Sequence, residues 1–155
     1  MKVLANITLY FIGGLFAATL SLILLTIIPP LDYFPLKYLT IGLNVLAEEG
    51  VKLVFLWYLF ALIQKLTSVK KILSLAIIFA SGFSFFEALL ITLNLTTSLN
   101  IFFAFNILIH IITSTFLILF IYKYQKQQKL STQSIIFLIL AIFIHLCYNL
   151  FVGMS

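Results

Sequence analysis

The sequence predicts an all-α fold, a polytopic transmembrane bundle of about five helices that forms one integral-membrane domain over residues 1–155. Long apolar runs recur along the whole chain, and hydrophobic residues make up 64% of it. Charged residues make up only 8%, against roughly 25% in ordinary soluble domains. A chain of this length with this composition fills a bundle of spans and leaves no soluble domain of useful size.

Each apolar run has about the length that crosses a bilayer core, roughly 20 residues. The first starts beside Lys2, and because it is longer than the roughly 7–15 apolar residues of a signal peptide, we expect it to stay as a span. Turn-forming or polar residues separate the later runs. The predicted helices cover residues 3–28, 38–64, 72–94, 101–122 and 134–152, with breaks at Pro29, Pro30 and Pro35, from Lys65 to Lys71, from Asn94 to Asn100 and from Lys123 to Gln133.

The lysines predict how the bundle is oriented, because positive charge accumulates on the cytoplasmic side of membrane proteins. Five spans put most of them on one side and only Lys37 on the other, while Lys52 falls inside a span. The N-terminus is then cytoplasmic and the C-terminus outside. The lysines on the cytoplasmic side are Lys2, Lys65, Lys70, Lys71, Lys123, Lys126 and Lys129.

Most of the acidic residues and both histidines lie inside predicted spans, where an unpaired charge costs about 2.5–3.5 kcal/mol. Such groups are expected to face one another. At about 1.5 Å per residue, Glu48 lies roughly 16 Å and His110 roughly 14 Å from the outer ends of their spans. Glu87 and His145 lie roughly 10 Å from theirs. Four helices therefore place these groups in one layer of the outer half of the membrane.

Helical spacing extends each of these positions into a polar stripe, because residues four apart share a face. Lys52 lies one turn from Glu48, and we expect it to stabilise the ionised form of that carboxyl group. The spacing also places asparagines on the same faces. The stripes are Asn44, Glu48 and Lys52; then Phe83 and Glu87; then Asn106 and His110; then His145 and Asn149.

The order of these motifs, Glu48-Glu49-x-x-Lys52, Phe83-x-x-x-Glu87, a lone His110 and His145-x-x-x-Asn149, resembles the PrsW family of membrane proteases. That family is related to the CAAX prenyl protease and bacteriocin-processing (CPBP) superfamily. Those relatives have an arginine one position later in the first motif and a histidine at the end of the second.

The resemblance implies a glutamate-dependent intramembrane protease, a multi-pass protein of a prokaryotic cell membrane. Its substrate would be a membrane-anchored protein or peptide, and nucleic acid is not an expected partner. Glu48 and Glu49 would be the essential acids, with Glu87, His110 and His145 completing the site. Asn149 would help to bind the oxyanion. The supporting residues would be Lys52, Asn44, Phe83 and Asn106.

These groups could supply a base for water, donors for the oxyanion and an acid for the leaving amine without a cofactor. We assign Glu48 as the base, His110 to the water or its proton, and His145 with Asn149 to the oxyanion. One alternative is a metal-dependent membrane protease that holds a divalent metal such as zinc on Glu48, Glu87, His110 and His145. Others are a proton- or cation-coupled transporter and an inactive member of the fold that only binds a membrane partner.

Overall fold

A computed structural model of the chain confirms the all-helical fold. It describes residues 2–27, 36–62, 68–94 and 101–154. The helices are α1 (Lys2–Ile27), α2 (Leu36–Leu62), α3 (Val69–Asn94), α4 (Ile101–Gln127) and α5 (Thr132–Met154).

Most helix boundaries lie within three residues of those predicted. The exception is α4, which continues to Gln127 instead of ending near residue 122. Hydropathy marks where a helix leaves the apolar layer, whereas backbone hydrogen bonds continue into water until a residue leaves helical geometry. Gln128 does so, with a φ of 53°. The breaks expected at Pro29, Pro30 and Pro35, and most of the one from Asn94 to Asn100, lie outside the described residues. The break expected from Lys65 to Lys71 is described only from residue 68 on, and there it is shorter than predicted, because α3 begins at Val69 and contains Lys70 and Lys71.

The turn after α4 leads into a capped start of α5. The backbone N–H of Ser134 donates to the Ser131 hydroxyl (3.2 Å), and the backbone N–H of Ser131 donates to the Ser134 hydroxyl (2.9 Å). This reciprocal pair satisfies two N–H groups that a helix start leaves without partners. The cap fixes where α5 begins and so where His145 lies along it.

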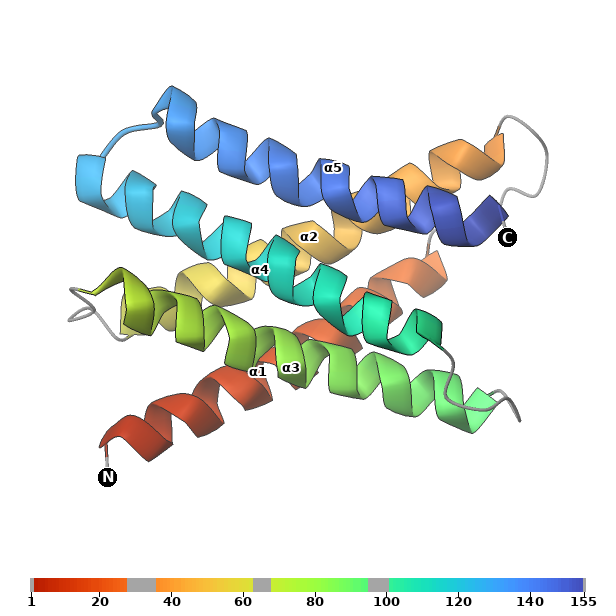
Figure 1. Cartoon of the computed structure of the whole chain (residues 1–155), viewed down its shortest axis with the longest axis horizontal. Coiled ribbons are helices and arrows are strands. Elements are labelled where there is room, and N and C mark those ends of the chain that lie inside the picture. Colours follow the sequence, from red (N-terminus) through yellow and green to blue (C-terminus); the bar gives the residue numbers. More distant parts are fainter. Residues whose placement is uncertain (1, 28–35, 63–67, 95–100, 155) are drawn as a thin grey trace.

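The helices form two packed layers (Figure 1). α3, α4 and α5 lie side by side in one layer, while α1 and α2 cross behind them. α1 packs on α3, and α2 packs on α1, α4 and α5. Because α2 contacts both α4 and α5, side chains from these three helices can meet inside the bundle.

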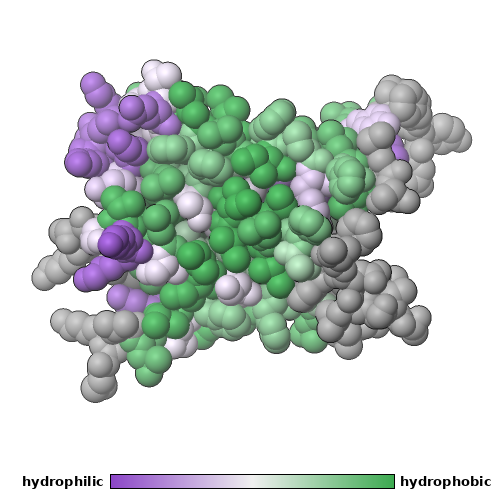
Figure 2. Space-filling model, in the orientation of Figure 1, coloured by the Kyte–Doolittle hydropathy of each residue, from purple (hydrophilic) through white to green (hydrophobic). Residues whose placement is uncertain are grey.

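Within the described residues, four helices (α1, α3, α4 and α5) are long and apolar enough to cross a membrane. α2 has 27 residues, but it carries Glu48, Glu49 and Lys52 in its middle. Hydrophobic residues cover the central part of the surface, and hydrophilic ones gather at one end, where the described lysines are Lys70, Lys71, Lys123, Lys126 and Lys129 (Figure 2). This is the surface pattern of a membrane protein.

Two glycines let α1 and α3 approach closely. A Cβ at Gly14 would collide with the carbonyl oxygen of Phe79, and one at Gly82 would collide with the carbonyl oxygen of Phe11. Buried alanines lie on both helices, as in small-residue interfaces of membrane helices: Ala17 and Ala18 on α1, and Ala76 and Ala80 on α3. Gly14 and Ala18 lie four residues apart on α1, the spacing that allows close approach of helices, and both are buried. The part played by Gly82 was not predicted.

Candidate functional site

The middle of α2 buries three charged side chains in the bundle. Glu48, Glu49 and Lys52 are all at most 7% exposed. Charges buried in this way are stable only when they have partners of opposite charge or good hydrogen bonds. The partners come from α4 and α5, which contact α2, and from α3.

Glu49 is the most heavily bonded carboxylate of the site. Its Oε1 atom accepts a hydrogen bond from Lys52 Nζ (2.7 Å) and lies 2.6 Å from His145 Nδ1. The ion pair with Lys52 is fully buried, at 0% and 1% side-chain exposure. Glu49 therefore joins α2 to α5 and neutralises the lysine.

Lys52 has a second partner on α4. Its Nζ atom lies 2.7 Å from His110 Nδ1, and it also lies 4.5 Å from the centre of the Phe83 ring. The Phe83 ring packs in turn on the His110 ring, with 4.9 Å between their centres. Phe83 thus gives the ammonium a cation–π contact and covers the imidazole.

Glu87 extends the cluster to α3. Its Oε2 atom lies 2.5 Å from His110 Nε2 and accepts a hydrogen bond from Asn106 Nδ2 (3.1 Å). This short contact ties the Glu87 carboxylate to the His110 imidazole. With 25% of its side chain exposed, Glu87 is the most open carboxylate of the cluster.

Glu48 is the carboxylate with the fewest contacts. It makes no hydrogen bond within the described residues, and its Oε2 atom lies 3.5 Å from His145 Nε2. Glu48, His110 and His145 each offer one ligand atom, and these three atoms lie within 4.8 Å of one another. A point between them can therefore lie within about 2.8 Å of each, which is a hydrogen-bond distance. One oxygen atom placed there could contact all three groups.

The structure brings together Glu48, Glu49, Glu87, His110 and His145 with the supporting residues Lys52, Phe83 and Asn106. The site lies in the middle of α2 and, on α3, α4 and α5, toward the end of the bundle opposite Lys70, Lys71, Lys123, Lys126 and Lys129. Glu87 is in the last third of α3, and His110 and His145 lie toward the same end of α4 and α5 (Figure 1). This agrees with the common depth that the sequence predicts.

Two asparagines lie outside the hydrogen-bonded network. Asn149 follows His145 by one turn but makes no hydrogen bond within the described residues, and Asn44 has a buried Oδ1 atom without a partner. Lys52 also differs from expectation, because it pairs with Glu49 rather than with Glu48. Positions three and four apart share a helix face, and His145 draws the Glu49 carboxylate towards the same point as Lys52.

The four residues expected as metal ligands do not form one set. Glu48, His110 and His145 form a group of the right size, whereas the Glu87 carboxylate is taken up by His110 and Asn106. One carboxylate and two imidazoles are nevertheless a donor set that zinc uses in catalytic sites.

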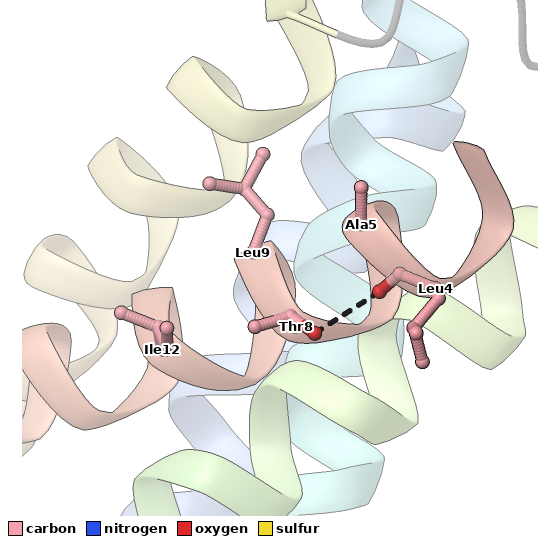
Figure 3. Close-up of a pocket in the computed structure, with 5 residues that line it drawn as sticks. All are labelled: Leu4, Ala5, Thr8, Leu9 and Ile12. Carbon is pink, nitrogen blue, oxygen red and sulfur yellow. Dashed lines mark hydrogen bonds between the residues drawn. The ribbon is translucent and has the colours of Figure 1, made fainter. Parts of the chain in front are cut away.

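A shallow apolar groove elsewhere on the surface is formed by one helix only (Figure 3). Its lining residues all come from the first half of α1: Leu4, Ala5, Thr8, Leu9 and Ile12. Its one polar side chain, Thr8, donates its hydroxyl to the Leu4 carbonyl (3.1 Å). The groove thus has the character of a lipid-facing surface and offers no group for chemistry.

The contacts within the buried cluster therefore make it the candidate site. Comparison of the chain with protein-family models, with curated proteins and with solved structures finds no match.

Proposed function

We propose that this protein is an intramembrane peptidase of the PrsW type, which cleaves a membrane-anchored protein with water activated by Glu48. The observation that carries the proposal is the group of Glu48, His110 and His145, whose ligand atoms lie within 4.8 Å of one another. A carboxylate and two imidazoles around one water supply a base and hydrogen-bonding groups for peptide hydrolysis.

Glu48 is the carboxylate best suited to act as the base. Glu49 is held by Lys52 and His145, and Glu87 by His110 and Asn106, so both have other partners. Glu48 has no hydrogen bond to give up within the described residues, and 10% of its side chain is exposed. It can therefore take a proton from water without breaking a hydrogen bond of the described bundle.

In the proposed reaction, Glu48 takes a proton from the water as the water oxygen bonds to the peptide carbonyl carbon. The tetrahedral intermediate carries its negative charge on the former carbonyl oxygen, where the imidazoles can stabilise it. When the C–N bond breaks, Glu48 returns the proton to the leaving amine. No atom or electron is required from a cofactor.

The position of the cluster favours a substrate that lies in the bilayer. Carboxylates and imidazoles inside an apolar bundle are reached from lipid or from the near end of the bundle, where Glu87 is partly exposed. The lysine-rich end is farther away. A membrane-anchored protein cut near the end of its span fits this location.

The test is a comparison of membrane proteomes from cells that express the wild-type protein or the Glu48→Gln variant. We expect new protein N-termini in the wild type, reduced about 10²–10⁴-fold in the variant, which is the usual contribution of a general base. Ser81→Ala is the matched control, because the Ser81 hydroxyl only donates to Ile77 of its own helix. Equal cleavage by wild type and Glu48→Gln would exclude the proposed role of Glu48.

A metal-dependent peptidase is the second candidate, favoured by the same three ligand atoms. A bound zinc ion would polarise the scissile carbonyl and activate the water. Metal analysis of the purified protein, followed by a cleavage assay with and without chelator, distinguishes the two candidates. Stoichiometric metal whose removal abolishes cleavage would favour the second.

A further inference from the structure

The Glu49–Lys52 ion pair contacts both histidines of the site, each at the Nδ1 atom. Lys52 Nζ lies 2.7 Å from His110 Nδ1, and Glu49 Oε1 lies 2.6 Å from His145 Nδ1. The two contacts are of the same kind in geometry but opposite in chemistry, because one partner is a cation and the other an anion.

Lys52 determines which nitrogen of His110 carries the ring proton. An ammonium group has three donors and no acceptor, so the nitrogen it contacts must accept. The lysine is held as an ammonium by the buried Glu49 carboxylate and by the Phe83 ring. His110 Nδ1 is therefore unprotonated, and the ring proton lies on Nε2, which faces the Glu87 carboxylate oxygen at 2.5 Å.

Glu49 has the opposite effect on His145. A carboxylate that is paired with an ammonium only accepts hydrogen bonds, so His145 Nδ1 must donate to it. In the neutral ring Nε2 then carries a lone pair. This atom faces the Glu48 carboxylate across 3.5 Å. The arrangement resembles the carboxylate–histidine pairs that orient an imidazole in hydrolases.

We propose that the Glu49–Lys52 ion pair is a positioning device that holds the two histidines in opposite tautomers, His110 as the Nε2–H donor and His145 as the Nε2 acceptor. Lys52 and Glu49 act through the imidazoles and need not touch the substrate. Lys52 and Glu49 keep each other charged. Neutralising either one would therefore weaken both the Lys52–His110 and the Glu49–His145 contact.

The two tautomers give the histidines different roles in catalysis, an inference that rests on the proposed peptidase function. His110 Nε2–H lies 2.5 Å from Glu87 Oε2 and is the group that can turn from this carboxylate to a developing oxyanion. His145 Nε2 can accept a hydrogen bond from the water beside Glu48. These roles are the reverse of those expected from the sequence, which assigned the water to His110 and the oxyanion to His145.

The arrangement also bears on metal binding, because a metal ligand must offer a lone pair. His145 Nε2 does so. His110 does not, since Lys52 occupies Nδ1 and the proton occupies Nε2. A metal bound by both rings would require Lys52 to lose its proton or to move away.

The experiment measures the ring ¹⁵N shifts and ring ¹H–¹⁵N couplings of the histidines in purified full-length protein in lipid nanodiscs at neutral pH. The chain contains only two histidines, so two ring systems are seen, and a His145→Gln sample assigns them. We expect His110 with its proton on Nε2 and His145 with its proton on Nδ1. A proton on His110 Nδ1, or a doubly protonated His110, would overturn the proposal.

Variants at Lys52 test the cause of the His110 tautomer. Lys52→Met should let His110 Nδ1 take up a proton as well, because Glu87 still faces Nε2 but no ammonium faces Nδ1. It should lower cleavage about 10–100-fold, the usual effect of losing a partner that orients an active imidazole. Lys52→Arg should keep the Nε2–H tautomer, because a guanidinium also only donates. Lys70→Met, at an exposed lysine, is the matched control and should leave both spectra and cleavage unchanged.

The wild-type spectrum tests the two proposed tautomers even if the Lys52→Met variant fails to fold. An unchanged His110 tautomer in a folded Lys52→Met protein would contradict the proposal. The test of the tautomers is independent of the peptidase function. If the expected tautomers are found but no substrate is cleaved, the peptidase proposal is wrong and the positioning role stands. If substrate is cleaved but the tautomers differ, the positioning role is wrong and the peptidase proposal stands.

Discussion

The contact between α1 and α3 and the cluster joining α2 to α5 are both buried, yet they are held together by different physics. At the first, backbones meet because Gly14 and Gly82 have no side chain. At the second, a chain of contacts runs from His110 to Lys52, from Lys52 to Glu49 and from Glu49 to His145. The first contact depends on shape and the second on charge pairing.

The two contacts are therefore sensitive to different substitutions. A packing contact fails when volume is added, whereas a polar cluster in an apolar surrounding fails when one partner is removed and the other stays charged. Glu48 is the exception within the cluster, because no hydrogen bond depends on it. A side chain that contributes charge without a stabilising bond is better explained by function than by stability.

The largest effect on stability is expected from Glu49→Leu. It leaves Lys52 and His145 without their buried partner, and breaking a buried ion pair costs about 3–5 kcal/mol. The free energy of unfolding can be measured by SDS titration in mixed micelles. The double variant Glu49→Leu/Lys52→Met should recover part of the loss, and a double variant less stable than either single one would contradict the charge-pairing account.

The next effect is expected at the crossing of α1 and α3. Gly14→Ala or Gly82→Ala should each cost about 1–3 kcal/mol, because the added Cβ meets backbone that cannot rotate away. The same titration measures the loss. Gly13→Ala is a close control on α1, since its Cβ would meet only the flexible end of Leu59. Equal losses at Gly13 and Gly14 would show that the crossing is not the cause.

A smaller effect is expected from Asn106→Ala, which removes the hydrogen bond to Glu87. Bonds between side chains in membrane bundles contribute about 0.5–2 kcal/mol. Cleavage should also fall, because Glu87 loses a contact that fixes it beside His110. Stability is measured as above and cleavage by mapping of new N-termini. An Asn106→Ala protein with unchanged stability and unchanged cleavage would remove Asn106 from the network.

The smallest effect, and the only gain, is expected from Gly42→Ala. A Cβ at Gly42 meets nothing within 4 Å, so only the helix propensity changes, by about 0.5–1 kcal/mol in favour of alanine. The opposite signs at Gly42 and Gly14 would separate glycines kept for close packing from glycines without such a contact. A loss at Gly42 would show a contact that the described residues do not contain.

Local properties of the sequence were enough to predict the helices and the charged members of the cluster, whereas Asn44 and Asn149, predicted with them, lie outside its hydrogen bonds. A run of about 20 apolar residues identifies a span wherever it occurs. The position of Glu48, Glu87, His110 and His145 along their spans predicts a common depth, because rise per residue is constant in a helix. The charge of Lys52 inside a span predicts a buried partner.

The pairing of side-chain atoms within the cluster follows from the tertiary structure alone. Hydropathy and spacing treat Glu48 and Glu49 almost alike, yet Glu49 bonds Lys52 and His145 while Glu48 stays without a hydrogen bond. The physical reason is that lateral order and rotation of each helix about its axis come from packing between helices, including the glycine contact of α1 with α3. Those rotations decide which ring nitrogen meets a cation and which meets an anion.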